Sequence, residues 1–185
     1  MIFDLIRKRR SVFPPQYNNR PILKQDIEKI LEAANWAPNH KHTEPWRFKV
    51  IQGDTKARLG EFLSEKYRES DPRPKQMKIK KLQENPRKAA AVIAICIQRD
   101  PKESLPEWEE TAAVAMAVQN MWLCCTEMGI GAYWSSPGLI KYMDGFFDLN
   151  EGERCLGFFY MGYFDGELPE ATRRTPISEK TTWLN

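Results

Sequence analysis

The sequence "AAAVIAICI" occupies residues 89–97. It is a continuous apolar run rich in β-branched residues, which is typical of a strand covered on both faces. The later segment 107–128 is predicted to be the longest helix, and between Ala112 and Val118 it is apolar on every side. A helix that is apolar all round is expected to be buried, so we predict a long central helix.

Further helices and strands are predicted on both sides of this pair. Apolar residues at helical spacing predict helices over residues 1–10, 24–36 and 55–67. Trp46, Phe48 and Val50 alternate with basic residues, which predicts a strand with one buried face. Two more strands are expected, at "AYW" and "RCLGFFYMGYF", with the helical segment "LIKYMDGFF" between them. Helices and strands intermix without regular βαβ alternation, so the predicted class is α+β.

Residues 67–87 differ in composition from the rest of the chain. The stretch "YRESDPRPKQMKIKKLQENPR" is charged, interrupted by prolines and poor in apolar residues. This composition indicates exposed chain, so we predict a lid-like excursion with one or two basic helical turns.

The bulk composition excludes several classes of protein. The chain has 185 residues, 42% of them hydrophobic, which predicts a single folded domain over residues 1–185. The net charge of +3 is too small to argue for nucleic acid. No window approaches the ~18 apolar residues of a membrane span. The four cysteines show no metal or CxxC spacing. We therefore expect a protein of the reducing cytoplasm with no metal, nucleic-acid or membrane partner.

A basic cluster, Arg7 to Arg10, meets Ser11 at the end of the first helix. One interpretation is a solvated helix end, favoured by the helix dipole. The other is a phosphate site, because guanidinium groups offer planar forks for phosphate oxygens and serine adds a hydroxyl donor. A nuclear-localisation signal is a weaker alternative for so few charges.

The loop "NHKHTE" at residues 39–44 holds both histidines of the chain. Glu44 is the only nearby carboxylate, so a zinc site is a poor prediction, and a polar surface for a ligand is preferred. The segment "GIGAYWSSPG" at residues 129–138 contains only GxG and lacks the context of a Rossmann phosphate loop. Its small residues would let backbone N–H groups approach a flat ligand, or they form a plain turn.

Four blocks of this sequence, taken together, resemble the nitroreductase family of flavin enzymes. They are "RKRRSV", "AANWAPNHKHTEPWRFKVI", the apolar helix ending in "MGIGAYWSSPG", and "FDLNEGERCLGFFYMGY" followed by "RRTPISEKTTW". The likeness runs from about residue 2 to residue 183, and the histidine-bearing loop is similar to that of the compact, YdjA-like branch. It implies a central antiparallel or mixed sheet, flanked by helices around a long buried helix.

The resemblance also implies a homodimer with two FMN molecules at the subunit interface. By this likeness Arg9, Arg10, Ser11 and the later Arg174 hold the ribityl-phosphate. The loop with His40, His42 and Glu44 reaches a flavin from the opposite subunit, and Trp36 lies against the same cofactor. Trp134, Ser135 and Ser136 flank the isoalloxazine ring. Glu44 departs from the glutamine of many relatives, and an ionised carboxylate cannot donate a hydrogen bond.

The function implied by the resemblance is electron transfer from NADH or NADPH to a small-molecule acceptor. Nitroaromatics, quinones and similar electrophiles are the expected acceptors in a ping-pong cycle. Residues 67–87 are expected to overhang the site and to set the choice of acceptor. FMN carries this chemistry, so no catalytic side chain is expected. The alternatives are a non-catalytic flavin-storage protein and a small basic binding domain.

Overall fold

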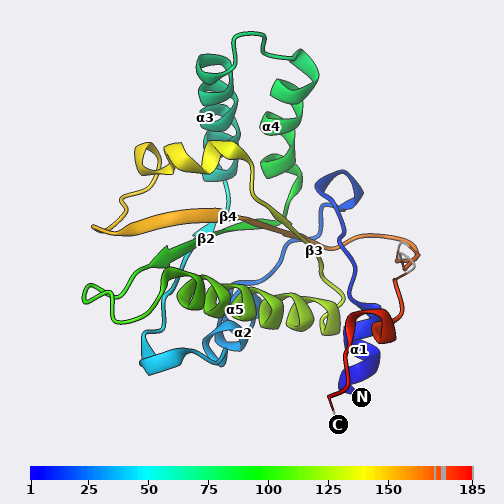
Figure 1. Cartoon of the computed structure of the whole chain (residues 1–185). Helices are drawn as coiled ribbons and strands as arrows, with labels where there is room; N and C mark the ends of the chain where they lie inside the picture. The colour runs from blue at the N-terminus through cyan, green and yellow to red at the C-terminus, as the bar shows by residue number, and fades with distance from the viewer. Residues whose placement is uncertain (169, 172–173, 185) are drawn as a thin grey trace.

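The computed structural model describes residues 1–168, 170–171 and 174–184. The described chain contains a four-stranded sheet in the order β1-β2-β4-β3, with every neighbouring pair antiparallel (Figure 1). The strands are β1 (Trp46–Ile51), β2 (Ala91–Gln98), β3 (Gly131–Ser135) and β4 (Glu153–Gly162). Residues 91–97 of β2 are all buried, which confirms the prediction made from the apolar run.

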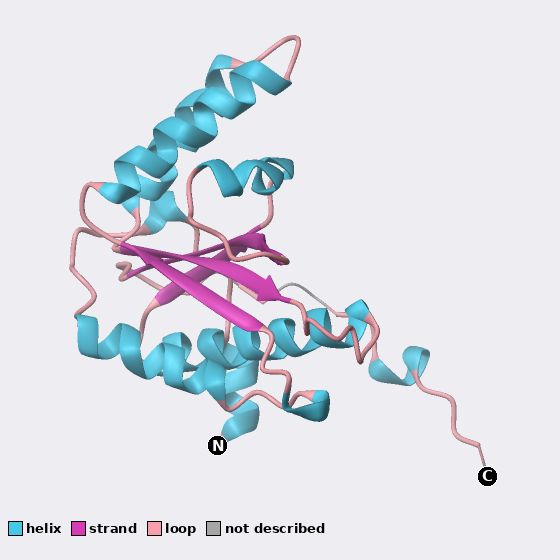
Figure 2. Cartoon of the chain, turned by 90° about the vertical axis from the view of Figure 1, so that its left-hand side faces the viewer, coloured by secondary structure: helices cyan, strands magenta, loops and turns pink. Residues whose placement is uncertain are grey.

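Helices cover both faces of the sheet (Figures 1 and 2). On one face lie α2 (Lys24–Asn35) and α5 (Glu107–Glu127), and on the other lie α3 (Thr55–Ser70), α4 (Gln76–Lys88) and the short 3-10 helix η3 (Gly138–Gly145). Ile93 and Ile95 of β2 pack toward α2 and α5, whereas Val92 and Ala94 pack toward α3 and η3. Two apolar cores on one sheet explain why β2 needs apolar residues at successive positions. The predicted α+β class and the flanking helices are confirmed.

The long helix α5 lies on one face of the sheet. Val114, Val118 and Met121 are buried, but Ala115 is exposed and Met116 keeps 40% of its surface exposed. The prediction that residues 112–118 are buried on every side is therefore wrong within one chain, because the sheet and α2 cover only part of the helix circumference. In the described part of the chain, no helix combines the length and the apolar character that a bilayer crossing requires.

Residues 67–87 form regular structure, unlike the predicted excursion with one or two helical turns. Tyr67 belongs to α3, and α4 is a helix of 13 residues. The two helices α3 and α4 are antiparallel and project from the sheet as a helical hairpin (Figure 2). Ile79 of α4 is buried beside Leu59, Leu63 and Tyr67 of α3. One sparse apolar stripe on α4 is enough to dock it, and the low apolar content hid this stripe from the composition argument.

Both ends of the described chain expose apolar side chains. The first helix, α1 (Ile2–Lys8), has no buried residue. The C-terminal segment contains a short 3-10 helix, η4 (Ile177–Lys180), and Figure 2 shows it running away from the body. Trp183 keeps 84% of its surface exposed and Leu184 is exposed too, so the pair does not anchor this segment to its own chain.

Candidate functional site

An arginine-lined cavity of about 810 Å³ lies beside α1. Among the residues lining it are Arg9, Arg10, Ser11 and Arg174. The structure therefore brings together all four residues predicted to bind phosphate, although Arg174 lies at the other end of the sequence. We call this space the arginine cavity.

The segment after α1 is fixed by β3. Ser11 forms a bridge with Ala132, and the N–H of Val12 donates to the Ala132 carbonyl over 3.0 Å. A side chain on Gly131 would collide with Val12, because its Cβ would lie 2.8 Å from the Val12 Cβ. Glycine at residue 131 is thus what allows the basic segment to lie directly on the strand.

Trp122 of α5 positions the two arginines, and nothing in the sequence distinguishes it from the other five tryptophans. The guanidinium of Arg9 lies 4.6 Å from the centre of the Trp122 ring. The Trp122 Nε1–H donates to the Arg10 carbonyl over 3.2 Å. Arg10 Nη1 in turn donates to the Arg9 carbonyl over 2.9 Å. These contacts hold the backbone that presents the arginine cavity.

The charges of the arginine cavity fit a phosphate. Burial, followed by the charges of Arg174 and Arg10, lowers the pKa of Arg9. Glu170 is the one carboxylate among the described residues that line the cavity. A doubly charged phosphate would relieve the repulsion among these guanidinium groups and accept their forked hydrogen bonds.

Trp134, the next-to-last residue of β3, is partly buried and packs against the core. A Cβ at Gly157 of β4 would lie 2.3 Å from Trp134 Nε1, so the indole occupies the space that a side chain would need. This Nε1 is buried and has no hydrogen-bond partner among the described residues. Gly157 also sits at a β-bulge where Ile95 pairs with Gly157 and Cys96 with Cys155. The Trp134 side chain therefore packs inside the protein, at the end of β3 that leads into the turn.

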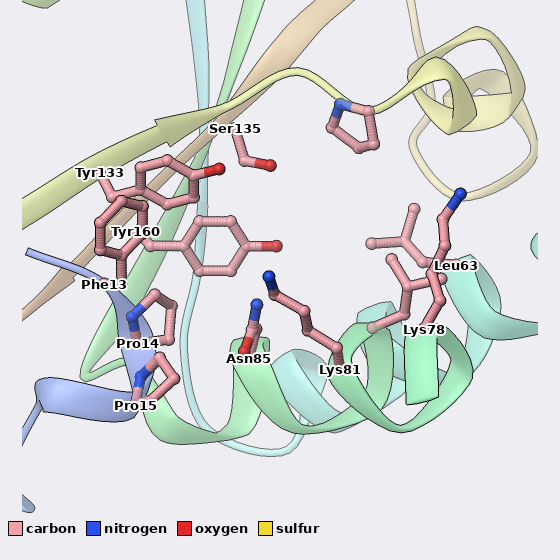
Figure 3. Close-up of a pocket in the computed structure, with 12 residues that line it drawn as sticks. Phe13, Pro14, Pro15, Leu63, Lys78, Lys81, Asn85, Tyr133, Ser135 and Tyr160 are labelled. Atoms are coloured by element: carbon pink, nitrogen blue, oxygen red, sulfur yellow. The ribbon is translucent and has the colours of Figure 1, made fainter. Parts of the chain in front are cut away.

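A second cavity, of about 570 Å³, opens between α4 and the ends of β3 and β4 (Figure 3). Phe13 lines both cavities, and Ser135 lines the second one. Tyr133, Tyr160 and four residues of α4 also line it, and sequence reasoning missed them. A signal existed, since Lys78, Lys81, Leu82 and Asn85 have the i, i+3, i+4, i+7 spacing of one helix face. We call this space the aromatic cavity.

The histidine-bearing loop adopts a strained backbone. It contains a short 3-10 helix, η2 (His40–His42), and Lys41, His42 and Glu44 have positive φ values of 53°, 53° and 42°. His40 Nδ1 lies 2.7 Å from Glu109 Oε2 of α5. Lys41 Nζ donates to the Ser104 carbonyl over 3.0 Å. Non-glycine residues in this region cost about 1–3 kcal/mol each, so these contacts hold a conformation that the isolated loop would avoid.

Within one chain this loop does not reach the arginine cavity. His40 contacts Glu109 near the start of α5, whereas Arg9 and Arg10 contact Trp122 near its end, about 20 Å away at 1.5 Å per residue. Figure 1 shows α1 and the loop before β1 at opposite ends of α5. Trp36, 79% exposed, follows α2 and donates its Nε1–H to Glu32. Of the residues the structure describes, no group of three or more His, Cys, Asp or Glu could hold a metal.

Known proteins resemble this chain along most of its length. It matches the model of the Nitroreductase family over residues 6–163. It is 32% identical over 182 residues to YfhC of Bacillus subtilis strain 168, which is named as an NAD(P)H nitroreductase; the match covers 97% of this chain and 92% of YfhC.

Solved structures share the fold. A nitroreductase-like family protein from Bacillus cereus has 31% identity and a TM-score of 0.87, with 100% of this chain and 96% of that one covered. A protein named as a nitroreductase from Desulfovibrio desulfuricans, solved in complex with FMN, has 23% identity and a TM-score of 0.74, with 97% and 94% covered. The likeness drawn from the sequence blocks is confirmed: the chain belongs to the nitroreductase family.

Proposed function

We propose that this protein is an FMN-dependent NAD(P)H oxidoreductase. Arg9, Arg10, Ser11 and Arg174 would hold the phosphate of FMN in the arginine cavity. The backbone of residues 134–136 would face the flavin ring. The bridge between Ser11 and Ala132 places the basic segment on β3, the strand that leads to these residues. When bound, FMN would supply the redox chemistry by which a hydride from NAD(P)H reduces an acceptor in two half-reactions.

We propose that the working unit is a homodimer that shares each flavin between two chains. The strained loop with His40, His42 and Glu44, together with Trp36, would complete the site of the other subunit, because it cannot reach the arginine cavity of its own. Three groups of exposed apolar side chains favour such an assembly: Ile2 and Phe3 on α1, Met116 on α5, and Trp183 near the C-terminus. Four free cysteines fit a reducing cytoplasm.

The net reaction would consume NAD(P)H, one proton and an acceptor. A quinone would leave as a hydroquinone, and a nitro group would become a nitroso group with release of water. The donor is oxidised to NAD(P)⁺ in both cases. The protein contributes positioning and positive charge, and the cationic Arg9 and Arg10 would also stabilise negative charge on a reduced ring.

The observation that carries this proposal is the convergence of Arg9, Arg10 and Arg174 on one cavity beside β3. The test is the visible spectrum of the purified protein before and after anaerobic addition of NADH or NADPH. A yellow protein whose absorbance near the flavin band bleaches, and returns when a quinone is added, supports the enzyme. A colourless protein that FMN does not stabilise favours a binding domain, and bleaching without turnover favours flavin storage.

His40→Ala is expected to weaken FMN retention about fivefold, which is the effect of losing one ordinary hydrogen bond. Equilibrium dialysis of the flavin-loaded dimer measures it. Glu109→Gln is the matched control, because it weakens the His40–Glu109 pair but leaves the imidazole in place. Equal losses in both variants would mean that His40 acts only by shaping its own loop, and full retention in His40→Ala would remove it from the site.

A further inference from the structure

The aromatic cavity has a wall of aromatic rings. Tyr133 and Tyr160 have ring centroids 6.2 Å apart with their planes at 24°, and Phe13 lies 4.6 Å from Tyr133 with its plane tilted by 52°. Leu63 and Leu82 also line the cavity. A cavity of about 570 Å³ has the size of a small-ligand site, and aromatic rings along one wall suit a planar aromatic guest.

The charge of this cavity is positive and uncompensated by its own walls. Lys78 and Lys81 line it, and none of its lining residues, all of them described, is acidic. Figure 3 shows Lys81 and Asn85 directed from α4 toward the hydroxyl group of Tyr160. Lys78 Nζ lies 4.1 Å from the centre of the Tyr67 ring. The neighbouring Lys80 instead pairs with Glu84, outside the cavity.

The hydroxyl group of Tyr160 adds an uncharged hydrogen-bond donor to the aromatic cavity. Burial, with a smaller effect of Tyr133, raises the pKa of Tyr160 above its ordinary value. This phenol therefore stays protonated at neutral pH and does not compete with a ligand for the lysine charge. An anionic group near Lys81 would meet an ammonium, a phenol and the Asn85 amide.

The aromatic cavity lies next to the proposed flavin site. Its wall includes Ser135 of the turn expected beside the flavin ring, and Phe13 separates it from the arginine cavity. A guest bound here would thus lie next to the redox ring, on the side away from the phosphate. This step rests on the proposed function.

We propose that the aromatic cavity selects an aromatic electron acceptor that carries a carboxylate, and that Lys81 is the residue that recognises the carboxylate. The apolar wall binds the ring, and the ammonium of Lys81 pairs with the negative group. Because Lys81 is solvent-exposed, the ion pair between its ammonium and the carboxylate of the acceptor would have the modest strength of a surface ion pair.

Two acceptors of nearly equal shape test the proposal. The ratio of kcat/KM for 4-nitrobenzoate to that for 4-nitrobenzamide is measured under anaerobic conditions with the flavin-loaded dimer. Lys81→Gln is expected to lower this ratio roughly fivefold, and Lys81→Glu to lower it further. Lys80→Gln, one residue away and outside the cavity, should leave the ratio unchanged. The FMN content should not change in any of the three variants, and Lys80→Gln should keep the wild-type rates with both acceptors.

Two results overturn the proposal. One is an unchanged ratio in Lys81→Gln and Lys81→Glu. The other is loss of FMN in Lys81→Gln, which would make the aromatic cavity part of the flavin site. Calorimetric binding of 4-nitrobenzoate and 4-nitrobenzamide to the same proteins needs no turnover. Tighter binding of the benzoate that depends on Lys81 supports the cavity assignment even if NAD(P)H oxidation is absent, and equal binding of both compounds contradicts it.

Discussion

Arg9→Gln is expected to weaken FMN binding by about 10- to 100-fold. The guanidinium of Arg9 stacks on Trp122 and is close enough to Arg174 and Arg10 for their charges to lower its pKa. A charge-assisted bond from it to the phosphate would be worth about 1.5–3 kcal/mol. A difference of about 1.4 kcal/mol is tenfold in affinity, which gives the stated range. Fluorescence titration of flavin-free protein with FMN measures the dissociation constant.

A second readout separates phosphate binding from folding. The flavin-free Arg9→Gln protein should be close to the wild type in stability, because the substitution removes both the repulsion from Arg174 and Arg10 and the stacking on Trp122. Added FMN should then raise its Tm less than that of the wild type. Arg20→Gln is the control, since Arg20 stacks on Tyr163 at 3.9 Å much as Arg9 stacks on Trp122, but does not line the arginine cavity. Equal losses of affinity in both variants would contradict a phosphate role for Arg9.

Gly157→Ala is expected to lower the free energy of unfolding by about 3 kcal/mol, through overpacking and backbone strain. Its φ of 153° is one that side chains rarely adopt, and the new Cβ would overlap the Trp134 indole. The strand end would have to move, and residues 134–136 with it. Urea unfolding of the flavin-free protein, together with FMN affinity, measures both consequences.

Gly138→Ala is the matched control for this substitution. Gly138 follows the same turn, and a Cβ there meets nothing within 4 Å. Its effect on unfolding should stay within about 0.5 kcal/mol. A Gly157→Ala protein of wild-type stability and flavin affinity would show that Trp134 can repack without moving the turn.

Much of the fold followed from apolar patterning. The run at 89–97 could belong only to a strand covered on both faces, and the spacing in 24–36 gave α2 nearly to the residue. Helix α4 was underestimated because Ile79, Leu82 and Pro86 are few among many charges. The outer face of α5 was misjudged since periodicity measures how apolar a surface is, and not whether the same chain covers it.

The candidate site was predictable only where a local motif carries the chemistry. Arginine next to serine predicted a phosphate site, which stays a prediction, and the structure places Arg9, Arg10 and Arg174 around one cavity. Trp122, Tyr133 and Tyr160 gave no such signal, because buried aromatic side chains look alike in sequence whether they support a core or a ligand. The sequence also could not show that the histidine loop lies a helix length away from the arginines of its own chain.

The most direct test of the shared site is a mixed dimer of Arg9→Gln and His40→Ala subunits, isolated with two different affinity tags. One of its sites combines wild-type Arg9 from one chain with wild-type His40 from the other, and the second site carries both substitutions. Titration with FMN should reveal one site of wild-type affinity per mixed dimer and none in either parent homodimer. A mixed dimer that lacks a wild-type site would show that Arg9 and His40 do not act on one flavin across the interface.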